Sequence, residues 1–135
     1  MFTSRSPSET QRIGYMCGEK AKAGDIYCLS GELGAGKTVF AKGFARGLGV
    51  ESEIVSPTFI IANEYTGRAP FFHLDCYRCG PDDIRDIGLD DYLFGGGVTL
   101  IEWAELIDYH LPENCVWVKI TKDAEDEDVR HINIH

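Results

Sequence analysis

The stretch from Gly31 to Thr38 carries the clearest chemistry in the sequence. It reads GELGAGKT and fits the pattern G-x-x-x-x-G-K-[ST]. Glycines let the backbone bend so that successive N–H groups point at phosphate oxygens. We expect Lys37 to reach the β- and γ-phosphates and the Thr38 hydroxyl to ligate Mg²⁺. An apolar stretch precedes the motif and a helical pattern follows it, which is the context that it requires. The motif therefore predicts a nucleotide phosphate site.

Two acidic residues follow stretches that are typical of buried strands. Glu102 ends the sequence VTLIE, and Asp75 ends PFFHLD. An enzyme with this kind of phosphate loop needs an acid at the end of a neighbouring strand to hold Mg²⁺ or its water. The less favoured alternative is that each acid is an ordinary residue that ends a strand. Both are candidates for the second half of the site.

A Ser-Pro segment lies between the loop and these acids. The residues Ser56, Pro57, Thr58 and Phe59 stand where a phosphate-loop switch senses the γ-phosphate, although Ser-Pro also favours a simple turn. The motifs of a GTPase are missing, because no Asp has a Gly three residues later and Thr121-Lys122-Asp123 places its Asp one position early. The sequence therefore favours ATP over GTP.

The elements that must position these residues alternate between helices and strands. Ser6, Pro7 and Glu9 have the arrangement of a helix start with a capping box, and we expect this helix to run to about Ala23. The other predicted elements are a strand at 25–30, a helix at 37–48, hairpin strands at 58–65 and 70–75, a helix at 82–93, a strand at 98–102, a helix at 104–110, and hairpin strands at 116–121 and 129–134.

This order predicts the fold class. Strands that alternate with helices are typical of a three-layer α/β domain, and the two hairpins indicate a mixed, mainly parallel central sheet. The length of 135 residues corresponds to one domain, 1–135. The expected fold is a single phosphate-loop NTPase domain.

Composition and charge exclude several classes of protein. No apolar run approaches the length of a membrane helix, and the polar N-terminus is unlike a signal peptide, so we expect a cytoplasmic protein without a membrane partner. The net charge is −9, from 22 acidic and 13 basic residues. Nucleic-acid phosphates bind Lys and Arg, and an acidic chain offers few of these residues. We therefore expect it to reach tRNA only indirectly, through a protein partner. The five cysteines are expected to be free thiols.

Four motifs together resemble one family. SGELGAGKT, VSPTF, HLDCYR and LIEWAE occur in the order found in the bacterial TsaE (YjeE) family of ATPases, and the resemblance covers about residues 6 to 134. Members support the formation of N6-threonylcarbamoyladenosine beside the anticodon of tRNAs that read ANN codons. They work with TsaD-like and TsaB-like proteins.

The resemblance implies a role for each matching residue. Thr38 and Glu102 would bind Mg²⁺, Lys37 would be catalytic with Glu102, and Asp75 would be a catalytic residue or hold the metal's water. The segment from Ser56 to Phe59 would be switch-like. The ATP-binding residues would be Ser6, Leu33, Gly34, Ala35, Gly36, Lys37, Thr38, Val39 and Val129, with the adenine between the N-terminal segment and the last hairpin.

Two other functions start from the same phosphate loop. A small-molecule kinase would need a substrate pocket and an Arg-bearing lid, and the sequence contains no Arg cluster for one. A regulatory module would hold the nucleotide with little hydrolysis, which Glu102 and Asp75 argue against. The favoured function is a slow, partner-dependent ATPase whose one internal arginine candidate for the γ-phosphate is Arg78.

Overall fold

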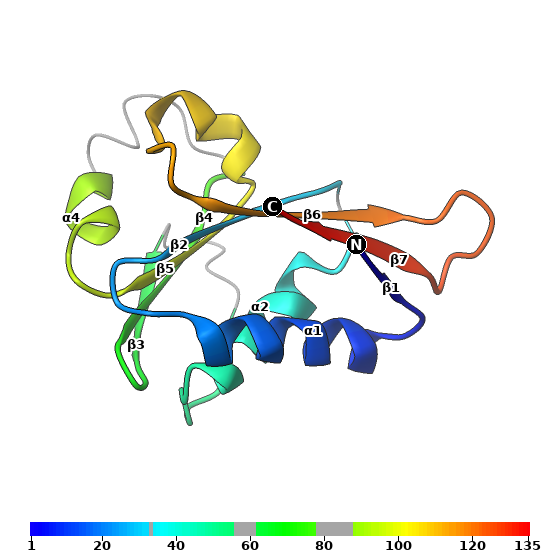
Figure 1. Ribbon diagram of the computed structural model, residues 1–135, viewed down its shortest axis with the longest axis horizontal. Helices are drawn as coiled ribbons and strands as arrows, with labels where there is room; N and C mark the ends of the chain where they lie inside the picture. The colour runs from blue at the N-terminus through cyan, green and yellow to red at the C-terminus, as the bar shows by residue number, and fades with distance from the viewer. Residues whose placement is uncertain (33, 56–61, 78–87) are drawn as a thin grey trace.

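The computed structural model describes residues 1–32, 34–55, 62–77 and 88–135. These residues form a seven-stranded sheet in the order β1-β7-β6-β2-β5-β4-β3 (Figure 1). Strands β6, β2, β5 and β4 run parallel to one another, whereas β1–β7, β7–β6 and β4–β3 pair antiparallel. The predicted mixed, mainly parallel sheet is confirmed. The strands are β1 Phe2–Ser4, β2 Ile26–Ser30, β3 Ala62–Thr66, β4 Pro70–Asp75, β5 Val98–Glu102, β6 Val116–Lys122 and β7 Arg130–Ile134.

Helices cover both faces of this sheet. Alternate residues of a strand point to opposite faces, so Leu29 packs in the core beneath α1 (Pro7–Lys20) and α2 (Lys37–Gly47), while Cys28 packs in the core beside α4 and η1. The short helix α4 spans Leu89–Leu93, and η1, Ala104–His110, is a 3₁₀-helix. Figure 1 shows α1 and α2 on one side of the sheet and η1 on the other. The expected three-layer α/β architecture is confirmed.

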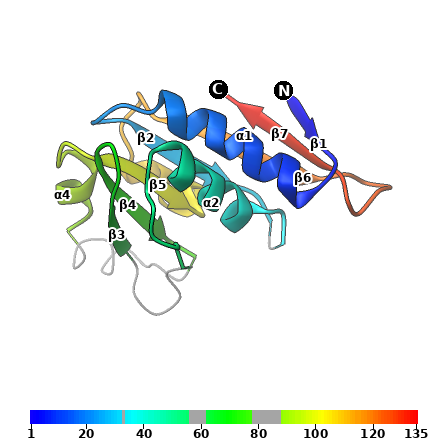
Figure 2. The same ribbon diagram turned by 90° about the horizontal axis from the view of Figure 1, so that it is seen from below.

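The helices α1 and α2 touch through their backbones (Figure 2). Gly14 and Gly18 of α1 face α2, and Gly43 and Gly47 of α2 face α1. A Cβ atom at Gly43 would lie 1.9 Å from the Gln11 carbonyl oxygen, which no side chain tolerates. The glycines therefore allow α1 to lie against α2, the helix that begins at the phosphate loop.

The predicted helix boundaries were wrong in two places. Helix α1 ends at Lys20, before the expected Ala23, because Ala21 turns extended and Arg68 donates hydrogen bonds to the carbonyls of Gly18, Glu19 and Ala21. A continuous helix at 82–93 is excluded by Gly88, which has a φ of 67° and precedes α4. The 82–87 part of that prediction, and the 58–61 part of the first hairpin, lie outside the described residues.

Two further elements differ from the prediction. Strand β1 was missed, because its three residues are too short for a periodic pattern and it forms by pairing with β7. The expected helix at 104–110 is a 3₁₀-helix interrupted at Ile107, whose φ is −127°. Among the described helices, none has both the length and the apolar character needed to cross a bilayer.

Parallel strands place the candidate site at one edge of the sheet. Asp75 at the end of β4 is in register with Glu102 at the end of β5, and Glu102 is in register with Leu29 of β2. The loop after β2 leads directly into α2. The carboxyl ends of these three strands therefore bring together segments that are far apart in the sequence, as is usual for ligand sites of open α/β sheets.

Candidate nucleotide-binding site

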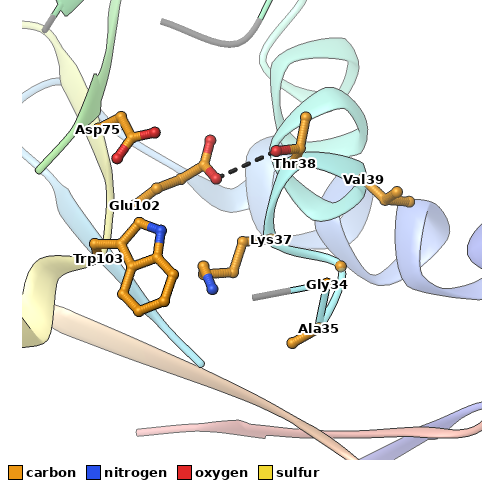
Figure 3. Close-up of a pocket in the computed structure, with 9 residues that line it drawn as sticks. Gly34, Ala35, Lys37, Thr38, Val39, Asp75, Glu102 and Trp103 are labelled. Carbon is orange, nitrogen blue, oxygen red and sulfur yellow. Dashed lines mark hydrogen bonds between the residues drawn. The ribbon is translucent and has the colours of Figure 1, made fainter. Parts of the chain in front are cut away.

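A cavity of about 390 Å³ opens at the carboxyl ends of β2, β4 and β5 (Figure 3). Figure 3 shows the side chains of Lys37, Asp75, Glu102 and Trp103 around it, with Thr38 and Val39 on the first turn of α2. Its lining residues are Gly34, Ala35, Gly36, Lys37, Thr38, Val39, Asp75, Glu102 and Trp103. The structure thus brings the two strand-end acids to the phosphate loop.

Glycines give the loop its shape. Gly31, Gly34 and Gly36 have φ values of 146°, 75° and 106°, a region that other residues rarely adopt. Gly36 is the residue before α2, so the loop ends where the helix exposes its first N–H groups and its positive dipole end. Such a helix start is suited to a phosphate group.

Lys37 is buried at the floor of the cavity, with 6% of its surface exposed. Its ammonium donates hydrogen bonds to the carbonyls of Gly31 and Glu32 and lies 3.9 Å from the centre of the Trp103 ring. Burial lowers the pKa of Lys37, and nearby carboxylates, Glu105 foremost, oppose that change. A phosphate group in the cavity would meet this cation together with the helix N–H groups.

A hydrogen-bonded chain holds Glu102 between Thr38 and His73. The Thr38 hydroxyl donates to Glu102 Oε1 over 3.3 Å, and His73 Nε2 lies 2.6 Å from Glu102 Oε2. The contact is a hydrogen bond when His73 Nε2 carries the proton and the Glu102 carboxylate accepts it. His73 is fully buried and Glu102 is 3% exposed. These hydrogen bonds hold a Glu102 carboxylate oxygen beside the Thr38 hydroxyl, and Mg²⁺ accepts both kinds of oxygen as ligands.

Asp75 and Trp103 form the far wall of the cavity. Asp75 accepts a hydrogen bond of 2.9 Å from the Tyr77 N–H, and burial raises the pKa of its carboxyl group. Trp103 has a φ of 60°, the left-handed conformation, and its ring packs 4.7 Å from that of Tyr77. This backbone conformation is uncommon for a bulky residue. In it, the Trp103 indole lies over the Lys37 ammonium.

A second hollow of about 220 Å³ lies on another side of the loop, between α1 and the β6–β7 turn. Ser6, Thr10 and Arg130 line it, with Pro7, Glu127, Asp128, Val39 and the loop residues Gly34, Ala35 and Gly36. Ser6, for which the family resemblance implied an adenine contact, is one of the residues that line this hollow. Val129 is 7% exposed and is not among the lining residues, although both of its neighbours are. Leu33 and the switch-like residues Ser56, Pro57, Thr58 and Phe59 lie outside the described residues, as does Arg78.

The structure adds His73, Glu105 and Lys122 to the site, and it places Arg130, beside the implied adenine contact Val129, against the loop. His73 binds Glu102, and Glu105 accepts a hydrogen bond from the Gly31 N–H over 3.1 Å. Arg130 donates to the carbonyls of Ala35 and Gly34 over 3.1 and 3.4 Å. The Lys122 ammonium lies against Gly34, 3.4 Å from where a Cβ atom would stand. The alternation of His73 and Asp75 on one strand face was a usable signal, and the family resemblance pointed to the region of Val129 and Arg130, though for the adenine and not for the loop.

Known proteins are similar to this chain over most of its length. The family model "Threonylcarbamoyl adenosine biosynthesis protein TsaE" matches residues 4–132. A protein of Bacillus subtilis named "tRNA threonylcarbamoyladenosine biosynthesis protein TsaE" is 46% identical over 123 residues, which cover 90% of this chain and 77% of that protein. A protein of Treponema pallidum with the same name is 42% identical, with 87% of each covered.

A solved structure has the same fold. The crystal structure of Bacillus subtilis YdiB aligns with a TM-score of 0.82 and 40% sequence identity, covering 98% of this chain and 82% of that one. The family model, the relatives and this structural match extend over nearly the whole chain, beyond the phosphate loop that many proteins share. The chain belongs to the family of threonylcarbamoyl adenosine biosynthesis proteins TsaE.

Proposed function

We propose that this chain binds Mg–ATP at the phosphate loop and hydrolyses it slowly to support the formation of N6-threonylcarbamoyladenosine beside the anticodon of tRNAs that read ANN codons. Membership of the TsaE family supports the pathway. The proposed ATP hydrolysis is supported chiefly by one observation: a single cavity is lined by Lys37, Thr38, Glu102 and Asp75. The hydrolysis takes place in the cytoplasm, where tRNA is modified.

The donor set at the cavity fits magnesium. Thr38 Oγ1 and Glu102 Oε1 are 3.3 Å apart and offer the oxygen ligands that Mg²⁺ prefers over nitrogen or sulfur. Two protein oxygens suffice, because this ion usually keeps several waters and takes the rest of its shell from phosphates. When bound, the ion neutralises charge on the β- and γ-phosphates. Thr38 and Glu102 would hold it, and His73 keeps the Glu102 carboxylate in place.

The nucleotide is ATP rather than GTP. The segment at 121–123 comes close to the guanine-binding motif of GTPases and ends in Asp123. This carboxylate accepts hydrogen bonds from His131 over 2.7 Å and from the backbone N–H groups of Glu125 and Asp126. These bonds hold the carboxylate within its own hairpin. The adenine would lie in the second hollow, against Ser6.

Hydrolysis requires a water in line with the γ-phosphate and positive charge around it. The Asp75 carboxylate lines the cavity opposite the loop and would orient that water. Among the described residues that line the cavity, Lys37 is the sole cation. Added positive charge is worth about 10³–10⁵ in rate in enzymes of this kind, so hydrolysis by the isolated chain is slow. Partners resembling TsaD and TsaB would accelerate it, and tRNA is reached through them.

Substitution of Glu102 tests this proposal. In Glu102→Gln the loop and Lys37 stay in place while the carboxylate charge is lost, so ATP binding persists and Mg²⁺-dependent phosphate release falls about a hundredfold. Glu113→Gln, an exposed residue, is the matched control. Hydrolysis and calorimetric binding are measured with and without the partner proteins. Wild-type phosphate release by Glu102→Gln would overturn the role of Glu102, and a labelled metabolite in place of free phosphate would identify a kinase.

A further inference from the structure

Arg130 joins the last hairpin to the phosphate loop. It is the first residue of β7, and its guanidinium reaches back across 95 sequence positions. Nε donates to the Ala35 carbonyl over 3.1 Å and Nη2 to the Gly34 carbonyl over 3.4 Å. Nη1 donates to the carbonyls of Glu127 and Val129 over 2.6 and 3.0 Å. The side chain is thus held by its own hairpin on one side and holds the loop with the other.

This contact bears on the direction of a loop N–H group. In a planar trans peptide, the carbonyl and the following N–H point in opposite directions. Because the Ala35 carbonyl is turned toward Arg130, the N–H of Gly36 points away from Arg130. The first bond of α2 is formed by the Phe40 N–H with the Gly36 carbonyl, so the N–H groups from Gly36 to Val39 have no earlier turn of this helix to bind. The contact with Arg130 thus orients the Gly36 N–H in the same direction as the free N–H groups of the first turn of α2.

The loop itself does not enforce this orientation. Gly34 and Gly36 flank Ala35, and glycine adopts positive and negative φ values with similar ease. A peptide between such residues can turn over at little cost unless a contact outside the loop holds it. Arg130 supplies such a contact, since its planar fork of donors fits two carbonyls at once.

We propose that Arg130 is a positioning residue of the phosphate site: it acts through the carbonyls of Ala35 and Gly34 and presents the Gly36 N–H to the nucleotide phosphates. The effect on affinity rests on the nucleotide binding proposed above. The orientation of the loop peptide does not, so it is measurable in the free protein.

The experiment compares Arg130→Gln with Arg130→Lys. Lysine keeps the charge but has no fork, and glutamine keeps a donor but has no charge. We expect both variants to fold, to shift the Gly36 amide NMR signal of the free protein more than the control does, and to weaken ATP and ADP binding about three- to tenfold. Arg46→Gln is the matched control, because Arg46 also donates to backbone carbonyls, those of Val50 and Glu51, away from the loop.

The results separate the role of Arg130 from the proposed nucleotide binding. Wild-type affinity in both Arg130 variants overturns the proposal. Wild-type affinity in Arg130→Lys with a loss in Arg130→Gln, at an unchanged Gly36 amide signal, also overturns it, because Arg130 then acts by charge. If the wild-type chain binds no nucleotide, the proposed function fails, and the Gly36 amide signal of the free protein alone decides whether Arg130 holds the loop peptide.

Discussion

Two arginines bind backbone carbonyls at opposite ends of α2. Arg130 binds the loop before the helix, at Gly34 and Ala35. Arg68, in the turn between β3 and β4, donates to Gly47 at the end of α2 over 3.0 Å and to three carbonyls at the end of α1. Figure 2 shows that turn beside the ends of both helices. The two side chains use the same donor chemistry on the same kind of acceptor.

The consequences differ because the two ends of a helix leave different groups unpaired. At a C-terminus the free groups are carbonyls, so a cation there satisfies them directly and favours the helix dipole. At the N-terminus the free groups are N–H donors, and an arginine acts only by turning peptides so that those donors face a ligand. One contact stabilises the fold, and the other shapes the site.

Of the variants that test the two ends of α2, Gly47→Ala at the C-terminal end is expected to have the largest effect, a loss of stability. A Cβ atom there would lie 2.1 Å from the Tyr15 carbonyl oxygen of α1, so the helices must move apart. Overpacking of this kind lowers the free energy of unfolding by about 3 kcal/mol. Urea unfolding measures it, with the exposed Lys42→Ala as control. Unchanged stability would show that the close approach of the helices is not needed.

Lys37→Ala tests the N-terminal end. The variant removes a buried cation from the cavity and is expected to weaken ATP binding by about a hundredfold, because charge-assisted phosphate contacts are strong. The overall fold is expected to persist. Calorimetric titration measures the affinity, with Lys42→Ala of the same helix as control. An affinity equal to that of the wild type would contradict the phosphate-loop assignment.

Arg68→Ala isolates the C-terminal clamp. It leaves carbonyls of α1 and α2 without their donor, and because Arg68 is exposed, water replaces part of the loss. We expect the free energy of unfolding to fall by about 1–2 kcal/mol, with ATP affinity unchanged. Denaturant unfolding and calorimetry on one preparation test both. A selective loss of ATP affinity at full stability would remove the distinction between the two ends.

The smallest effect concerns the hairpin that carries Arg130. The hydrogen bond with His131 lowers the pKa of Asp123 from 3.8 to about 2. The fold therefore favours the ionised carboxyl group, and its contribution to stability is present above about pH 4 and lost as the pH falls toward 2. Asp123→Asn should be less stable than the wild type at neutral pH, and this difference should shrink below pH 4. Urea unfolding from pH 2 to 7 measures it, with Asp108→Asn as control; a pH-independent difference would rule out this linkage.

Much of the site could be predicted because its signals are local. Gly36 and Lys37 lie where the motif requires, and Ser6 caps α1 by accepting from the Glu9 N–H as its spacing predicted. The strand ends at Asp75 and Glu102 followed from short apolar runs. Strand β1 carried no such signal.

What the sequence determined by itself is the chemistry that short segments contain: a strand, a glycine-rich loop, a helix, and acids at strand ends. Those follow from periodicity and local backbone preference. Only the tertiary structure decided that α1 ends at Lys20, that His73 holds Glu102, and that Arg130 reaches Ala35. Each of these depends on a hydrogen bond between segments distant in the chain, and the partner of such a bond is set by the packing of sheet and helices, which no local pattern encodes.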